Sequence, residues 1–134
     1  MVHPPDGDIL IHSGDWTYRG SATAIDKFLT WFVGQPHKHK LFCAGNHELG
    51  LDGGPDRELK LDIIKFFVNK NKNVHYLENS SINIEGINFY GSPASPFFHN
   101  WAFNYLRGED IKFVNASVCT ERYSPTNSPI VVDI

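Results

Sequence analysis

The sequence predicts an α/β fold built around a parallel sheet, and three observations carry this prediction. Short apolar runs of strand length alternate with longer segments in which apolar residues recur at helical spacing. The order between residues 9 and 77 is strand, helix, strand, helix, strand, which implies parallel strands joined by right-handed crossovers. The first two strands each end in a glycine-containing turn, and open α/β sheets bind ligands at such carboxyl ends of strands.

The first strand is expected at residues 9–12 and is nearly all apolar, as suits a strand covered on both faces. A helix then starts near Ser21 to Thr23, where either hydroxyl can cap it. Gly34 and Pro36 end this helix. Its apolar residues recur at helical spacing: Ile25, Phe28, Leu29 and Phe32.

The second strand is expected at residues 40–44, and a glycine-rich loop then leads into the second helix. Asp56 is the expected cap of this helix. The helix ends in the polar stretch 69–73, and the third strand follows at 74–77. The predicted buried stripe of the helix consists of Leu59, Ile63, Phe66 and Phe67.

Beyond the third strand the pattern becomes antiparallel. Polar and apolar residues alternate in 81–84 and 87–90 around Glu85-Gly86, which predicts a hairpin. The segment 91–104 is a loop rich in Pro, Phe and Trp, without clear periodicity. Final strands are expected at residues 113–118 and 130–134.

Composition excludes several classes of protein. The 134 residues make one domain of ordinary size. A net charge of −3 gives no electrostatic basis for binding a nucleic acid polymer. No apolar run approaches the ~20 residues that span a bilayer, so we expect no membrane association.

The two cysteines predict a reducing compartment. Cys43 and Cys119 each lie in an apolar stretch, and neither belongs to a C-x-x-C spacing. Buried free thiols are therefore favoured over a disulfide. The first residues lack the apolar core of a signal peptide, and we expect a cytoplasmic protein.

Two polar clusters stand at the ends of the first two strands: Gly14-Asp15 and Gly45-Asn46-His47-Glu48. Taken alone, Asp15 is a helix cap or an Asx turn, and Asn46-His47 is a polar loop. Strands joined by one helix crossover are expected to be neighbours, and their ends then bring Asp15 and Asn46 into one crevice. Carboxylate and amide oxygens suit a hard divalent cation, and an imidazole such as that of His47 can donate to a phosphate.

These residues resemble the calcineurin-like metallophosphoesterase superfamily, in particular its subgroup of metallophosphoesterase-domain-containing proteins. The likeness spans nearly the whole chain, and Gly-Asn-His-Glu is a specific motif. The matching stretches are Gly14-Asp15 with Gly20, residues 45–49 with Asp52, residues 89–93 with 101–104, and residues 114–119 with 125–129.

The resemblance implies a sandwich of two central sheets flanked by helices, and a site with divalent metal ions (Mn, Fe or Zn). By the same resemblance Asp15 is the bridging ligand, Asn46 is a ligand of the second ion, and His47 is the catalytic histidine that faces the phosphate. Glu48 is expected to anchor the loop or to orient His47. The implied reaction is attack of a metal-activated hydroxide on a small-molecule phosphoester, in particular a phosphodiester such as a cyclic nucleotide.

The chain also departs from the family pattern. The Asp-x-His pair expected on a strand before Gly14 has no counterpart, and no Gly-His dipeptide occurs anywhere. We therefore expect a single but incomplete domain, residues 1–134, which lacks an amino-terminal strand and an internal block near residues 110–113. Three hypotheses follow. The chain is a metal-dependent phosphoesterase, a non-catalytic member that binds a partner or pairs with a second copy through open sheet edges, or a spliced or incomplete form of a longer enzyme.

Residues outside the two motifs have alternative interpretations. His12 either reaches the crevice or packs beneath the sheet, whereas His37 and His39 precede a strand and belong at its opposite end. His75 is expected to be structural. The aromatic loop either lines a pocket for a nucleotide base or plugs a sheet edge. Its candidate pocket residues are His99, Trp101 and Phe103.

Overall fold

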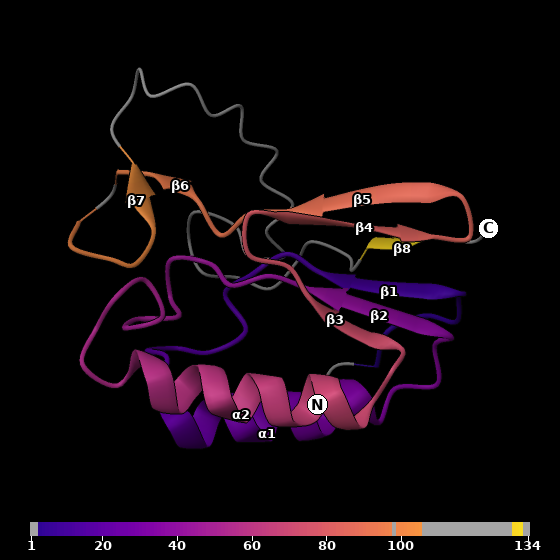
Figure 1. Cartoon of the computed structure of the whole chain (residues 1–134), viewed down its shortest axis with the longest axis horizontal. Coiled ribbons are helices and arrows are strands. Elements are labelled where there is room, and N and C mark those ends of the chain that lie inside the picture. Colours follow the sequence, from indigo (N-terminus) through magenta and orange to yellow (C-terminus); the bar gives the residue numbers. More distant parts are fainter. Residues whose placement is uncertain (1–2, 98, 106–129, 133–134) are drawn as a thin grey trace.

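The computed structural model describes residues 3–97, 99–105 and 130–132, and it arranges them in layers (Figure 1). Two helices lie side by side on one face of a four-stranded sheet. A two-stranded hairpin packs on the other face of that sheet. The predicted α/β class is confirmed, in the form of an incomplete α/β sandwich.

The central sheet has the strand order β3-β2-β1-β8. Strands β1, β2 and β3 run parallel, so that Leu10 lies opposite Lys40 and Lys40 opposite Val74. Strand β8 is antiparallel to β1 and pairs Ile130 with Ile11. The strand bounds are Ile9–His12 for β1, His39–Phe42 for β2, Val74–Tyr76 for β3 and Ile130–Val132 for β8. The predicted alternation of strands and helices is therefore confirmed.

Helix α1 spans Ala22–Val33 and begins as predicted. The Ser21 hydroxyl accepts a hydrogen bond from the Ala24 N–H at 3.2 Å and caps the helix. Gly34 follows its last turn. The residues predicted for its core face are all buried: Ile25, Phe28, Leu29 and Phe32.

Helix α2, Arg57–Lys70, confirms the predicted element but corrects two details. Asp56 makes no capping hydrogen bond, because its carboxylate instead pairs with the buried Lys60 ammonium at 2.8 Å. The predicted stripe is partly wrong, since Leu59 and Phe66 are 58% and 60% exposed. The helix turns Lys60 and Ile64 inward, because the apolar stem of a lysine packs well when its ammonium finds oxygen partners.

Apolar side chains form two cores, one on each face of the sheet. Leu10 packs with Phe28 of α1 on the helix side. Ile9 packs with Leu41 and with Ile84 of the hairpin on the other side. Because successive strand residues point to opposite faces, β1 serves both cores, as its continuous apolar character predicts.

The predicted hairpin is confirmed as strands β4, Ser80–Ile84, and β5, Ile87–Gly91. Glu85 and Gly86 have positive φ angles of 51° and 88°, as a tight two-residue turn requires. Within the predicted loop, the short strands β6, Ser95–Pro96, and β7, Asn104–Tyr105, pair in parallel. The strand predicted at residues 113–118 lies outside the described residues, as does Cys119.

The Cys43 thiol is free, as predicted, and burial raises its pKa to about 11. Neither helix in the described part of the chain is long and apolar enough to cross a bilayer.

Candidate functional site

The ends of β1 and β2 bring the two polar clusters together at one edge of the sheet. His12 at the end of β1 lies opposite Phe42 at the end of β2. The Cys43 N–H donates to the His12 carbonyl at 3.2 Å. The turns that carry Asp15 and Asn46 therefore start side by side, as the expected strand order requires.

Two glycines allow these turns to touch. Gly14 has a φ of 102°, and a Cβ on it would lie 2.8 Å from the Gly45 Cα. A Cβ on Gly45 would collide with Oδ1 of Asp15. Asp15 itself holds a φ of 57°, a conformation that Asp and Asn tolerate better than most residues. The Asp15 carboxylate therefore lies directly against the second turn.

The Glu48 carboxylate joins the two turns and is fully buried. Its Oε2 accepts hydrogen bonds from the Asp15 N–H at 2.9 Å and the Gly45 N–H at 2.7 Å. Its Oε1 accepts from the Thr17 N–H at 2.8 Å and the Thr17 hydroxyl at 3.0 Å. Of the two roles expected for Glu48, this geometry is that of an anchor.

The pKa of Glu48 is raised to about 7, chiefly by burial and to a smaller extent by the Asp15 charge, although hydrogen bonds from Gly45 and Thr17 oppose the rise. The four donated hydrogen bonds stabilise the ionised carboxylate, which accepts at both oxygens. Because both oxygens are engaged, Glu48 is not available as a metal ligand.

His47 is held in the crevice by contacts with Asp15, Tyr18 and Trp101. Its backbone N–H donates to Oδ1 of Asp15 at 3.2 Å. Its Nδ1 lies 3.0 Å from the Tyr18 carbonyl oxygen. Because a carbonyl only accepts, Nδ1 carries the proton, and in the neutral ring Nε2 holds the lone pair. The imidazole also contacts Trp101, with ring centroids 4.3 Å apart.

Asn46 occupies the middle of the second turn. Its neighbours Gly45 and His47 both contact the Asp15 carboxylate. Its own carbonyl accepts a hydrogen bond from the Ala102 N–H at 3.1 Å. The backbone thus sets Asn46 beside Asp15 and ties it to the aromatic segment.

The three residues predicted for a substrate pocket have different surroundings. Trp101 contacts the His47 ring, and the His99 ring lies 6.0 Å from that of Trp101. Phe103 is buried in the core on the helix side of the sheet. Its N–H donates to the Asp52 carboxylate at 3.4 Å. The structure brings Trp101 to the candidate site, and Phe103 packs in the core while it also borders a surface cavity.

The other histidines near β1 and β2 pack against neighbouring side chains or lie far from Asn46. His12 packs against Phe28 with ring centroids 5.2 Å apart, and burial lowers its pKa to about 4. Within the described residues its Nδ1 has no hydrogen-bond partner. His37 and His39 lie at the far end of β2 from Asn46, as predicted, and the His39 ring stacks near that of His75 at 6.3 Å.

Sequence reasoning missed Thr17 and Tyr18. Thr17 binds Glu48 through its N–H and hydroxyl, and its hydroxyl accepts from the Gly20 N–H at 2.8 Å. Tyr18 contributes its carbonyl to His47, and its ring centroid lies 6.1 Å from that of the imidazole. Thr17 could have been noticed, because a threonine between Asp15 and a glycine is typical of a turn. Tyr18 could not, because every residue type has a backbone carbonyl.

The donor types at this edge fit a hard divalent cation, which prefers carboxylate and amide oxygens. Asp15 and Asn46 offer one of each. Among the residues that the structure describes, however, no group of three or more His, Cys, Asp or Glu side chains is placed to hold an ion. Asp15 and Asn46 alone would supply two of the roughly six or more ligands that such an ion takes.

Known proteins are similar to this chain. The family profile described as calcineurin-like phosphoesterase matches residues 1–124. The chain is 26% identical to human metallophosphoesterase domain-containing protein 1 over 220 aligned residues, which take in 99% of this chain and 66% of the human protein. It is 38% identical to UPF0046 protein K07C11.7 of Caenorhabditis elegans over 111 residues, 75% of this chain and 38% of the worm protein.

The profile match includes both turns and far more than half of the chain. The chain spans about two thirds of the human relative's length and a smaller share of the worm protein. Members of the matched family are phosphoesterases that use divalent metal ions. From the two strand-end motifs and this match, we conclude that the chain belongs to the calcineurin-like phosphoesterase family.

Proposed function

We propose that this protein is a metal-dependent phosphoesterase whose substrates are phosphodiesters, with cyclic nucleotides among them. Asp15 and Asn46 are the proposed metal ligands, and His47 is the proposed catalytic residue that faces the phosphate. The observation that supports this proposal is the contact between the Asp15 carboxylate and the turn that carries Asn46 and His47. That contact brings the backbone of residues with an acid, an amide and an imidazole side chain close together at the carboxyl end of a parallel sheet, which supports the proposal.

His47 is prepared to handle a proton at Nε2. The Tyr18 carbonyl accepts a hydrogen bond from the Nδ1–H group. A proton that is added to the neutral ring therefore binds at Nε2. The protonated ring can then donate from Nε2 to a phosphoryl oxygen or to a leaving oxygen. Asp15 and Asn46 are the ligands that this proposal assigns, and the metal is a requirement for activity without an assigned geometry.

Hydrolysis of bis(p-nitrophenyl) phosphate tests the proposed reaction. We expect turnover that requires added Mn²⁺ or a similar ion and that falls by ~10²-fold or more in Asp15→Asn, since the site depends on that charge. Asp62→Asn is the matched control, because Asp62 is an exposed carboxylate on α2. Turnover that survives Asp15→Asn, or that needs no metal, would contradict the proposal.

A non-catalytic role is the alternative, and the shortage of donors among the described residues supports it. The alignment with the human relative runs over 220 residues, whereas this chain has 134, so the human protein contains residues without a counterpart here. We propose that an internal block near residues 110–113 accounts for part of this difference. Such a chain would act by binding a partner, or by pairing with a second copy through open sheet edges.

Calorimetry with Mn²⁺ and Zn²⁺ separates the two functions. Two ions bound per chain, as in the two-metal sites of phosphatases, support the enzyme. Failure to bind either ion, together with absence of hydrolysis, supports the non-catalytic role. Size-exclusion chromatography of the same sample then shows whether the chain pairs with itself.

A further inference from the structure

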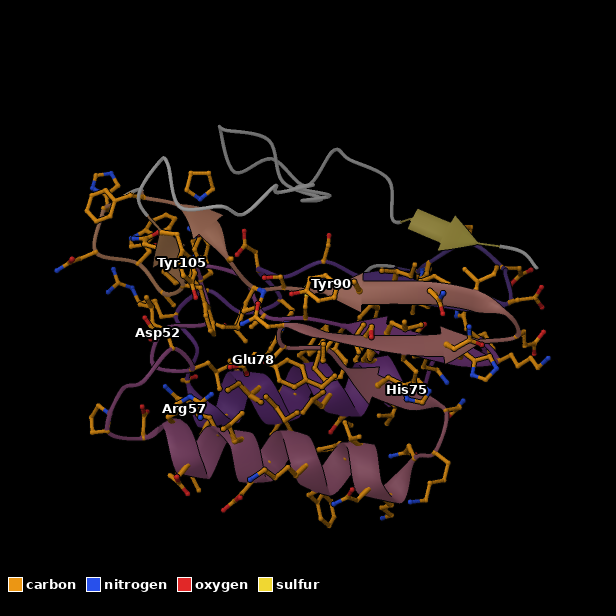
Figure 2. The ribbon with its side chains drawn as sticks, turned by 45° about the horizontal axis from the view of Figure 1, so that its top comes forward. Asp52, Arg57, His75, Glu78, Tyr90 and Tyr105 are labelled. Atoms are coloured by element: carbon orange, nitrogen blue, oxygen red, sulfur yellow. The ribbon has the colours of Figure 1, made fainter. Side chains whose placement is uncertain are left out.

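A polar cavity of 320 Å³ is lined in part by residues that closely follow Trp101 in the chain. Its volume falls at the lower end of the range for small-molecule sites, ~300–1,000 Å³. Figure 2 shows three of the lining residues, Asp52, Glu78 and Tyr105, toward the same end of the molecule. The full lining comes from the glycine-rich loop, the turn after β3 and the β7 segment, and consists of Asp52, Glu78, Asn79, Phe103, Asn104 and Tyr105.

One segment of chain both contacts the candidate site and lines the cavity. Trp101 contacts the His47 ring, and the Ala102 N–H donates to the Asn46 carbonyl. The next three residues, 103–105, line the cavity. Three residues of chain span at most ~11 Å, so a small molecule with its phosphate at His47 can place its organic part in the cavity.

The charges of the lining disfavour an anion. None of the six lining residues is positively charged, and Asp52 and Glu78 are acidic. Glu78 is balanced, because Arg57 donates to its Oε1 at 2.9 Å and the Tyr76 hydroxyl donates to its Oε2 at 3.0 Å. Asp52 remains as an exposed carboxylate at the rim. A second phosphate would meet this carboxylate without a compensating cation among the lining residues.

The hydrogen-bonding groups of the lining suit hydroxyls. Asp52 only accepts, whereas the Asn79 amide and the Tyr105 hydroxyl also donate. The Asn79 amide is oriented by the Ser92 hydroxyl, which donates to its Oδ1 at 2.7 Å and leaves the amino group to donate. A hydroxyl both donates and accepts, so a diol pairs with this mixed set, whereas an ammonium ion would leave the donors of the lining without partners.

We propose that this cavity binds the hydroxylated organic part of the phosphoester substrate, such as a sugar ring, while the phosphate lies at His47. The placement of the phosphate rests on the proposed function. The preference for hydroxyls rests on the cavity lining and can be measured without turnover.

Ligand-observed NMR on the full chain, with two neutral probes, tests the proposal. The probes are methyl riboside, which carries a vicinal diol, and methyl 2-deoxyriboside, which lacks one of its hydroxyls. We expect the riboside to bind, and the deoxyriboside to bind about fivefold more weakly, the ratio that corresponds to one hydrogen bond of ~1 kcal/mol.

Two variants and a control locate the binding. Asp52→Ala removes the acceptor at the rim, and Tyr105→Phe removes a hydroxyl while it keeps the ring. Each should weaken riboside binding by a factor of about five, again the value of one hydrogen bond. Asp62→Ala, on the exposed face of α2, should leave it unchanged. The second variant keeps the test valid if Asp52→Ala fails to fold.

Equal binding of the two probes overturns the cavity assignment, and so does unchanged riboside binding in both variants. Displacement of the riboside by a lower concentration of ethanolamine also overturns it, because that marks a cation site. Riboside binding without phosphodiester hydrolysis keeps the cavity and contradicts the proposed function. Hydrolysis without riboside binding supports the proposed function and contradicts the cavity assignment.

Discussion

The Glu48 carboxylate fixes the geometry of the candidate site more than any other single side chain in the described residues. It accepts four hydrogen bonds from groups in both turns. Each of these groups belongs to Asp15, Thr17 or Gly45. The position of the Asp15 backbone therefore depends on a carboxylate that itself has no oxygen to spare for a ligand.

Glu48→Gln tests this dependence. Glutamine has one carbonyl oxygen and one amino group, so the amino group must face N–H donors from Asp15 and Gly45 or from Thr17. We expect the free energy of unfolding in urea to fall by about 2–4 kcal/mol, through lost hydrogen bonds and buried donors without acceptors. Glu58→Gln, at an exposed position of α2, should change it by less than about 0.5 kcal/mol. Equal effects of the two substitutions would contradict the anchoring role.

Gly45→Ala tests the contact between the turns. The added Cβ collides with the Asp15 carboxylate, so the turns must separate. We expect a loss of at least about 2 kcal/mol in the free energy of unfolding. Gly34→Ala is the control, because the Gly34 φ is −73° and its Cβ would meet the Trp31 carbonyl oxygen at an ordinary 3.4 Å. A tolerated Gly45→Ala would show that the turns do not touch.

His12 makes stability depend on pH. Burial lowers its pKa to about 4 in the folded protein, whereas the unfolded chain binds a proton near its ordinary pKa of ~6.5. The contribution of neutral His12 is therefore complete above pH 6.5 and is lost as the pH falls toward 4, by up to about 3 kcal/mol. Urea unfolding across this window should show the loss in the native protein.

His12→Phe should remove this part of the pH dependence. Glu48 contributes with the opposite sign, because its raised pKa makes stability fall as the pH rises toward 7. The difference between the two proteins isolates His12, since both contain Glu48. Parallel stability curves for the two proteins between pH 6.5 and 4 would contradict the assignment.

The sequence indicates candidate site residues, but it does not indicate the partners that hold them. Asp15, Asn46, His47 and Glu48 stand out because polar types follow apolar runs. The partners of Glu48 could not be predicted, since they lie up to 33 residues away and act largely through backbone N–H groups. Backbone donors are the same in every residue except proline, so residue type carries no signal for them.

Helix α2 shows how an element can be predicted while its inward face is not. Its sequence offers several apolar stripes, and the tertiary contacts choose the one with Lys60 and Ile64 inside. The Lys60 ammonium pairs with Asp56 and donates to the Leu49 carbonyl, each at 2.8 Å. These partners lie in the loop that follows Glu48, so Lys60 ties the helix to the loop of the candidate site.

Lys60→Met tests this link. The substitution keeps the apolar stem and removes the ammonium, which leaves the Leu49 carbonyl and the Asp56 carboxylate without their donor. We expect the free energy of unfolding to fall by about 1–3 kcal/mol. Lys65→Met is the control, because Lys65 is exposed and its ion pair with Asp62 spans 3.5 Å. A loss no larger than in the control would place Lys60 outside the stabilising contacts.

Longer elements with a regular pattern of apolar residues were predictable from the sequence, and short elements were not. The hairpin β4–β5 follows from strict alternation around a glycine turn. The pairing of β6 with β7 involves two residues on each strand, which is too short for any periodicity to appear. The antiparallel pairing of β8 with β1 joins segments more than a hundred residues apart, and the sequence contains nothing that selects this partner.

At the scale of the whole molecule, the described residues combine an intact pair of strand-end turns with two candidate oxygen ligands, those of Asp15 and Asn46. The helices, the central sheet and the hairpin support the turns from both faces (Figure 1). The family match and the close contact of the turns support the proposed enzyme, and the alternative proposal of a non-catalytic protein starts from the lack, in the described residues, of a group of three or more His, Cys, Asp or Glu side chains placed to hold an ion. What decides between them is whether Asp15 and Asn46 bind one cation together.

A crystal structure of the protein soaked with Mn²⁺, with anomalous data collected at the manganese edge, tests this claim most directly. We expect an anomalous peak that lies within ~2.0–2.6 Å of a side-chain oxygen of Asp15 and also of the side-chain oxygen of Asn46, or a pair of peaks that share the Asp15 carboxylate. Manganese absent from this edge, with the two side chains too far apart to share an ion or an adjacent ion pair, would contradict it.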